Sequence, residues 1–91
     1  MNRLGFIFLS ILREKEATSR LSSMTVRELS LAEDFGVKEN TLFKKAREFE
    51  RRGYVGRGLK EGRAATFYIT AAGTDFLEEL RYEEKERRIG S

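Results

Sequence analysis

The spacing of apolar and polar residues predicts four helices and one β-hairpin. Apolar residues recur every three to four positions in residues 2–17, 26–35, 38–52 and 71–88, which is the spacing of one face of an α-helix. Two short alternating segments, at 54–59 and 65–70, have the pattern of paired strands, and they flank a turn in which Gly62 can supply a positive φ. The expected order is therefore three helices, a hairpin and a last helix.

Capping residues and glycines indicate where these helices begin and end. Asn2 is suited to cap the first helix, and Thr25 with Glu28 matches a capping box at the start of the second. Gly36 and Gly53 are expected to end the second and third helices, because a residue without a Cβ readily adopts the left-handed conformation.

The first helix carries more apolar surface than one small core requires. One stripe comprises Leu4, Ile7, Phe8, Ile11 and Leu12. Phe6 and Leu9 fall outside it, and the last helix has Tyr82 and Ile89 seven positions apart. We hypothesise that these four residues form a homodimer interface between first and last helices. The alternative is that Phe6 and Leu9 pack against the last helix of their own chain.

The helix expected at 38–52 has the clearest two-sided pattern. Its apolar seam comprises Leu42, Ala46 and Phe49, and the opposite face carries Asn40, Lys44, Arg47 and Arg51. Every side chain on that opposite face is a hydrogen-bond donor, and none is acidic. A helix of this kind fits the major groove of duplex DNA, so this face is a candidate nucleic-acid surface.

Positive charge is concentrated in the same part of the chain. The whole chain has a net charge of only +3, but residues 38–63 carry nine basic and four acidic side chains, a net charge of +5. Residues 1–37 are neutral and residues 64–91 have a net charge of −2. A positive face of this kind is typical of nucleic-acid binding, although a solvated basic helix is the alternative.

Other classes of function are excluded or unsupported by composition. The absence of cysteine and histidine excludes disulfides, thiol nucleophiles, Cys/His zinc sites and a histidine base. No motif proposes an enzyme, a cofactor or a metal site, and no apolar run approaches the roughly 18 residues of a membrane span. We therefore expect one non-enzymatic, cytoplasmic domain over residues 1–91, without a membrane partner.

Two segments resemble known DNA-binding proteins. LAEDFGVKENTLFKKAREFERRGYV (31–55) resembles the two DNA-binding helices of bacterial and archaeal transcriptional regulators, and FYITAAGTDFLEEL (67–80) resembles the strand and following helix of PadR-like and MarR-like families. This resemblance, over about 25–80, implies a mainly α winged helix-turn-helix: a three-helix core, a two-stranded wing at 54–70 and an extra C-terminal helix. In such families the third helix enters the major groove, and the protein is usually a homodimer on a palindromic operator.

The resemblance and the helical projection together predict which residues contact DNA. The set is Lys38, Asn40, Thr41, Lys44, Lys45, Arg47, Arg51, Arg57, Lys60 and Arg63. We expect Asn40 and Lys44 to read base edges, Arg47 to reach bases or phosphates, and the remaining side chains, including those of the wing, to favour phosphates. Relatives commonly carry a capping Ser where Lys38 stands, which leaves open whether Lys38, Glu39 or Asn40 points into the groove.

The sequence therefore predicts sequence-specific binding of double-stranded DNA by a small dimeric transcriptional regulator. Two alternatives remain at this point: a winged-helix protein-interaction module in a larger assembly, and a plasmid or viral replication or partition protein. Phe43, on the flank of the third helix, has two interpretations of its own. It contacts a thymine methyl or a sugar, or it packs against the wing or another helix.

Overall fold

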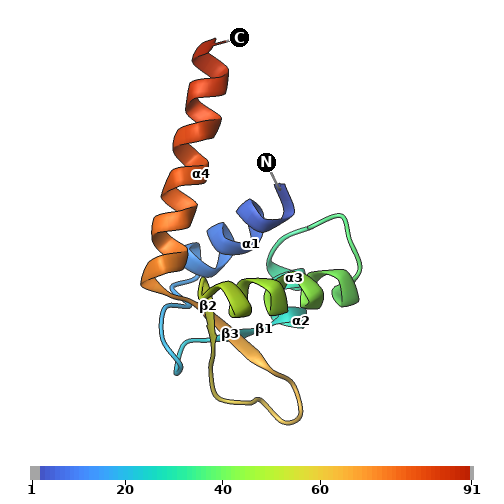
Figure 1. The fold of residues 1–91 in the computed structure, drawn as a ribbon. Coiled ribbons are helices and arrows are strands. Elements are labelled where there is room, and N and C mark those ends of the chain that lie inside the picture. The colour runs from blue at the N-terminus through green and yellow to red at the C-terminus, as the bar shows by residue number, and fades with distance from the viewer. Residues whose placement is uncertain (1–2, 91) are drawn as a thin grey trace.

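Residues 3–90, which the computed structural model describes, fold into four α-helices and a three-stranded antiparallel sheet (Figure 1). Side chains are described for residues 3–83. In chain order the elements are α1 (Arg3–Glu14), β1 (Met24–Thr25), α2 (Val26–Ala32), α3 (Glu39–Arg52), β2 (Val55–Arg57), β3 (Thr66–Ile69) and α4 (Ala71–Gly90). The architecture confirms the predicted winged helix-turn-helix.

α1 ends earlier than its apolar pattern indicated. It stops at Glu14, and the chain then turns through Glu16, which has a φ of 58°. Ala17, predicted to be helical, is instead fully buried, and its carbonyl accepts a hydrogen bond from the Ile69 amide at 2.8 Å. The Ala17 carbonyl is thus bonded to β3 and not within a continued α1. The predicted cap, Asn2, lies outside the described residues.

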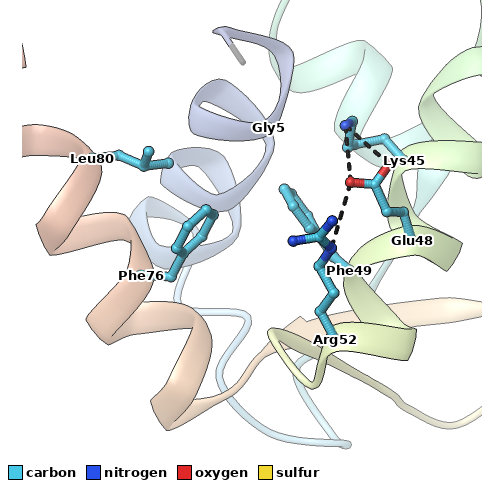
Figure 2. A pocket seen from close by; sticks show the side chains of 7 residues that line it. All are labelled: Gly5, Lys45, Glu48, Phe49, Arg52, Phe76 and Leu80. Carbon is cyan, nitrogen blue, oxygen red and sulfur yellow. Dashed lines mark hydrogen bonds and ion pairs between the residues drawn. The ribbon is translucent and has the colours of Figure 1, made fainter. Parts of the chain in front are cut away.

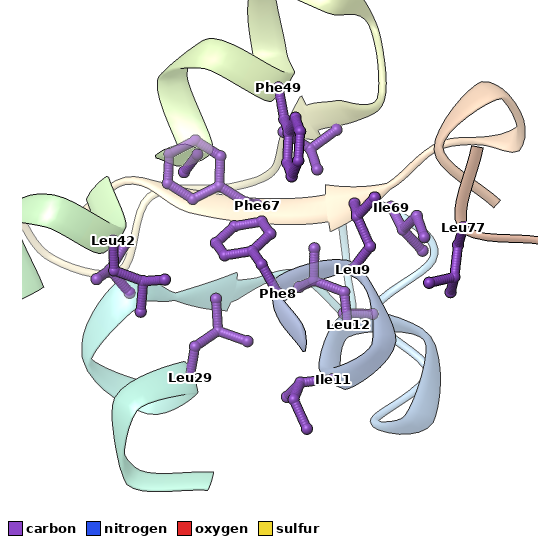
Figure 3. Packing of buried hydrophobic residues seen from close by; sticks show 14 residues of the cluster. Phe8, Leu9, Ile11, Leu12, Leu29, Leu42, Phe49, Phe67, Ile69 and Leu77 are labelled. Carbon is purple, nitrogen blue, oxygen red and sulfur yellow. The ribbon is translucent and has the colours of Figure 1, made fainter. Parts of the chain in front are cut away.

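α1 lies in the core of the fold and packs against α2, β3 and α4 (Figure 3). Phe8, Leu9 and Leu12 each have 0% of their surface exposed. The prediction that Leu9 belongs to a homodimer interface is therefore wrong, because this side chain is enclosed by its own chain. Phe6 is half-buried and packs against the same core. At the other end of α1, the Arg13 guanidinium donates a hydrogen bond to the Glu78 carboxylate of α4 and lowers the pKa of Glu78.

The start of α2 has the predicted capping box. Thr25 Oγ1 accepts a hydrogen bond from the Glu28 amide at 3.0 Å, and the Glu28 carboxylate accepts one from the Thr25 amide at 3.0 Å. Thr25 also ends β1, a strand that the sequence pattern did not predict. β1 pairs with β3 through Met24 opposite Phe67 and Thr25 opposite Thr66. The single residue Thr25 thus joins the sheet to the first helix of the helix-turn-helix.

α2 ends at Ala32, three residues before the predicted end. Glu33 is already extended, and the Asp34 carboxylate accepts a hydrogen bond from the Gly36 amide at 2.9 Å. This local side-chain turn competes with helix continuation. Gly36 has the expected positive φ, 72°, but within the turn rather than at the helix end. Ala32, the last residue of the helix, is exposed, whereas Phe35 in the turn is half-buried.

β2 and β3 form the wing, with strands shorter than predicted. Val55 pairs with Ile69 and Arg57 with Phe67, and residues directly opposite each other share one face of a sheet. Val55, Ile69 and Phe67 are buried on the face toward the helices, so Arg57 lies on that face as well. Gly62 has the predicted positive φ, 64°, in the turn.

α4 begins against the end of α3 and then leaves the domain. Thr70 Oγ1 accepts a hydrogen bond from the Gly73 amide at 3.0 Å. A Cβ at Gly73 would lie 2.0 Å from the Tyr54 carbonyl oxygen, so this close approach requires glycine. Leu80 is the last buried side chain among those described, and Tyr82 is 64% exposed, while the helix continues outward to Gly90 (Figure 1). Among the described helices, none has the length and apolar character needed to cross a membrane.

Candidate nucleic-acid interface

The residues that begin and end α3 differ in how they cap the helix. Lys38 is the N-cap, with an extended backbone and no side-chain capping hydrogen bond, so the first helical residue is Glu39. The missing hydroxyl cap is not replaced by Asn40. At the other end Gly53 takes the left-handed conformation, with a φ of 81°, and its amide bonds to the Glu50 carbonyl. Packing of the buried residues, rather than a side-chain cap, therefore determines which face of α3 is exposed.

The two faces of α3 are separated as the periodicity predicts. Leu42, Ala46 and Phe49 are at most 4% exposed and pack into the core. Asn40, Lys44, Arg47 and Arg51 are exposed. Within the described part of the chain, no hydrogen bond or ion pair involves any of these four side chains, so their donors are available to a ligand. Lys38 and Thr41 are also exposed, at the start of the helix.

A groove of about 490 Å³ lies between the wing, the first turns of α3 and the start of α2. The predicted wing residues Arg57, Lys60 and Arg63 all line it, together with Asn40 and Glu39 of α3. The structure thus brings the basic wing and the N-terminal half of α3 around one open channel.

Arg27 is a further cation of this groove that the sequence analysis did not identify. It is exposed in the first turn of α2 and lines the groove together with the wing residues. In helix-turn-helix proteins the helix before the recognition helix crosses the DNA backbone. A basic residue directly after the capping box was therefore the available signal, but the predicted charge cluster began only at residue 38.

Arg57 is held by α3 and by the wing. Its Nε donates a hydrogen bond to the Glu50 carboxylate at 3.1 Å, and its guanidinium lies 5.2 Å from the centre of the Phe67 ring. Phe43 of α3 meets Phe67 edge-to-face, with ring centres 6.0 Å apart. The structure therefore shows Phe43 in its packing role, against the wing.

Lys45 lies on a different side of α3 from the exposed face of Asn40, Lys44, Arg47 and Arg51, and its side chain reaches Glu48 (Figure 2). Its side chain is 11% exposed, and its ammonium lies 3.3 Å from a Glu48 carboxylate oxygen and 5.4 Å from the centre of the Phe49 ring. One step along a helix turns a side chain by about 100°, which takes Lys45 off the face of Lys44. It lines a pocket of about 220 Å³ between α1, α3 and α4 instead.

No group of three or more metal-ligating side chains occurs in the part of the chain that the structure describes. The dimer residues predicted from sequence are dispersed: Leu9 is buried, Phe6 is half-buried and Tyr82 is exposed on α4. The side chain of Ile89 lies outside the described residues.

The fold is shared with two solved structures. One is MepR, a transcription regulator of the Staphylococcus aureus multidrug efflux pump MepA, with a TM-score of 0.71 and 16% sequence identity over 98% of this chain. The chain spans 63% of the length of MepR. The other is the DNA-binding TubR fragment from Clostridium botulinum, with a TM-score of 0.67 and 29% identity over 88% of this chain and 96% of the fragment.

Comparisons of the sequence with protein-family models and with curated proteins find no match. The likeness to these two proteins is therefore a likeness of fold. It agrees with the winged helix-turn-helix that the order of helices and strands predicted.

Proposed function

We propose that this winged helix-turn-helix protein binds double-stranded DNA and regulates transcription. The observation that carries the proposal is the set of free donors on α3 beside a groove lined by basic residues from α2 and the wing. Of the two structural neighbours, MepR is a transcription regulator and the TubR fragment is DNA-binding, which supports the same conclusion.

In the proposed complex α3 lies in the major groove. Asn40 and Lys44 stand on its exposed early turns, where an amide suits adenine and an ammonium suits the guanine acceptors. Arg47 and Arg51 follow on the same face. Lys60 and Arg63 of the wing, and Arg27 of α2, contact phosphates on either side of the groove that they line. Phosphate contacts supply most of the affinity and base contacts the specificity.

Lys44 and Lys45 form a matched pair that tests the proposed face. We expect Lys44→Ala to weaken binding to a preferred duplex by about 1–3 kcal/mol, because its free ammonium faces the proposed DNA. Lys45→Ala removes the same charge from the chain, but from a side chain that is 11% exposed and paired with Glu48. It should therefore change DNA affinity much less.

Fluorescence anisotropy with labelled duplexes selected from random DNA measures both variants, and it also separates the proposed function from a protein-interaction module. Such a module should show little binding to any duplex at low salt. Equal losses for Lys44→Ala and Lys45→Ala would show that net charge, not this face, determines binding.

We also propose that the protein acts as a homodimer through α4. This helix extends to Gly90, and residues 81–83, the last whose side chains the structure describes, are exposed, including the aromatic ring of Tyr82. An isolated helical segment of this length is marginal in water, so a partner helix would stabilise it. Phe6 is only partly exposed, because α1 packs into its own domain, so only part of its side chain is available to the proposed dimer interface.

Sedimentation at micromolar concentrations tests the dimer. We expect a dimer for the unmodified protein and a dissociation constant raised about tenfold or more for Tyr82→Ala, the effect of removing an interface anchor. Leu31→Ala, which alters another exposed apolar side chain on α2, should leave association unchanged. A strict monomer would contradict the proposal.

A further inference from the structure

We propose that Glu50 is a positioning residue that holds the Arg57 guanidinium for contact with a DNA phosphate. The inference rests on the proposed DNA binding and deepens it. It assigns a role to an acidic side chain beside a mainly basic interface, where an acid would ordinarily oppose binding.

The strand register places Arg57 beside α3. Arg57 lies directly opposite Phe67 in the wing, and the Phe67 side chain is fully buried beneath the helices. The guanidinium therefore extends over the Phe67 ring, 5.2 Å from its centre, and its Nε meets the Glu50 carboxylate at 3.1 Å. The flat cation is held by a ring on one side and a carboxylate at its edge.

The contact with Glu50 uses only one part of the Arg57 donor set. A guanidinium has five N–H donors in a fixed planar fork, and the bond to Glu50 engages Nε. Within the described residues no hydrogen bond occupies the terminal Nη groups. Arg57 lines the groove with Lys60 and Arg63, so these remaining donors match a phosphate, which a guanidinium binds through two parallel hydrogen bonds.

Charge alone predicts the opposite role for Glu50. A carboxylate near DNA repels phosphates, and its removal should then raise affinity. Positioning predicts that its removal lowers affinity, because Arg57 loses its fixed orientation and must be ordered on binding. The chain offers a matched acid in Glu39, which lines the same groove and forms no ion pair with any described residue. The two acids should therefore respond in opposite directions.

The test measures binding of duplex DNA by Glu50→Ala, Glu50→Gln, Glu39→Ala and Arg57→Ala. We expect Glu39→Ala to raise affinity about twofold, the scale of an exposed charge interaction. Glu50→Ala should lower affinity about five- to tenfold, the scale of one typical intramolecular hydrogen bond. Glu50→Gln keeps an acceptor for Nε and should bind within about twofold of the unmodified protein.

A double-mutant cycle isolates the coupling of Glu50 with Arg57. In an Arg57→Ala background, Glu50→Ala should no longer lower affinity and should raise it slightly, as Glu39→Ala does. Thermal unfolding of each variant verifies folding. If Glu50→Ala does not fold, Glu50→Gln enters the same cycle: an effect of charge alone predicts the same increase in affinity with and without Arg57, whereas positioning predicts an increase only in the Arg57→Ala background.

Three results would overturn the inference. An increase in affinity for Glu50→Ala similar to that for Glu39→Ala would show that Glu50 acts only as a charge. Equal losses for Glu50→Ala with and without Arg57 would show that its role is independent of that residue. Absence of duplex binding by the folded, unmodified protein would overturn the proposed function itself, and this inference with it.

Discussion

Leu9→Ala should lower the free energy of unfolding by about 2–5 kcal/mol, the range for removing a fully buried leucine side chain. Leu9 has 0% of its surface exposed and lies on α1 within the central core (Figure 3). Since small domains have a total stability of about 5–15 kcal/mol, this substitution removes a large part of it. Urea unfolding followed by circular dichroism measures the change.

Leu31→Ala is the matched control, because it makes the same chemical change on α2 at a side chain that is 79% exposed. It should alter stability by no more than about 0.5 kcal/mol. Protein concentration adds a second test. A core residue destabilises equally at every concentration, whereas a residue at a dimer interface does so in a concentration-dependent way. A concentration-dependent loss for Leu9→Ala would return this residue to an interface.

DNA affinity should fall roughly a thousandfold between about 50 and 200 mM salt, the consequence of neutralising about six phosphates. The candidates for these contacts are exposed basic residues of α2, α3 and the wing: Arg27, Arg47, Arg51, Arg57, Lys60 and Arg63. A plot of log affinity against log salt concentration should then have a slope of about −5. Anisotropy titrations at several salt concentrations across this range give the slope.

Two variants separate phosphate contacts from base contacts on the same plot. Arg63→Ala should weaken binding to all sequences similarly and reduce the steepness of the slope by about one. Asn40→Ala removes a neutral amide, so it should leave the slope unchanged while reducing discrimination at particular base pairs. A slope near zero for the unmodified protein would contradict a phosphate-binding surface.

Several features of the fold were predictable because each depends on a short local sequence signal. The capping box at Thr25 and the left-handed glycine after α3 are determined by a few neighbouring residues, and both were predicted correctly. β1 was missed because two residues contain no alternation to detect. α2 was predicted too long because the hydrogen bond from Gly36 to Asp34 competes with the helix, and periodicity does not register such a bond.

The burial of α1 shows a different limit of sequence patterns. An amphipathic stripe describes a helix that rests on one surface, but α1 is surrounded by α2, β3 and α4. Leu9 lies off the stripe and is nonetheless fully buried. Only the arrangement of the other elements distinguishes such a residue from one that contacts a second subunit.

The candidate site likewise contains some residues whose positions followed from local sequence patterns and others whose positions depended on the arrangement of the whole fold. The donor face of α3 was predictable, because helical periodicity alone opposes Asn40, Lys44 and Arg47 to the buried seam. Lys45 was placed with them by charge, although the turn of the helix directs it to Glu48. The link from Arg57 to Glu50 depends on the pairing register of the wing, which the sequence did not specify.

Thr25 has a mechanical consequence for the groove. It is paired with Thr66 of the wing sheet and is also the residue whose side chain caps α2, so no flexible segment separates the two elements. A displacement of β3 on binding would therefore be transmitted directly to the start of α2 and to its Arg27. The placement of Arg27 relative to β3 is therefore set by the fold before any ligand binds.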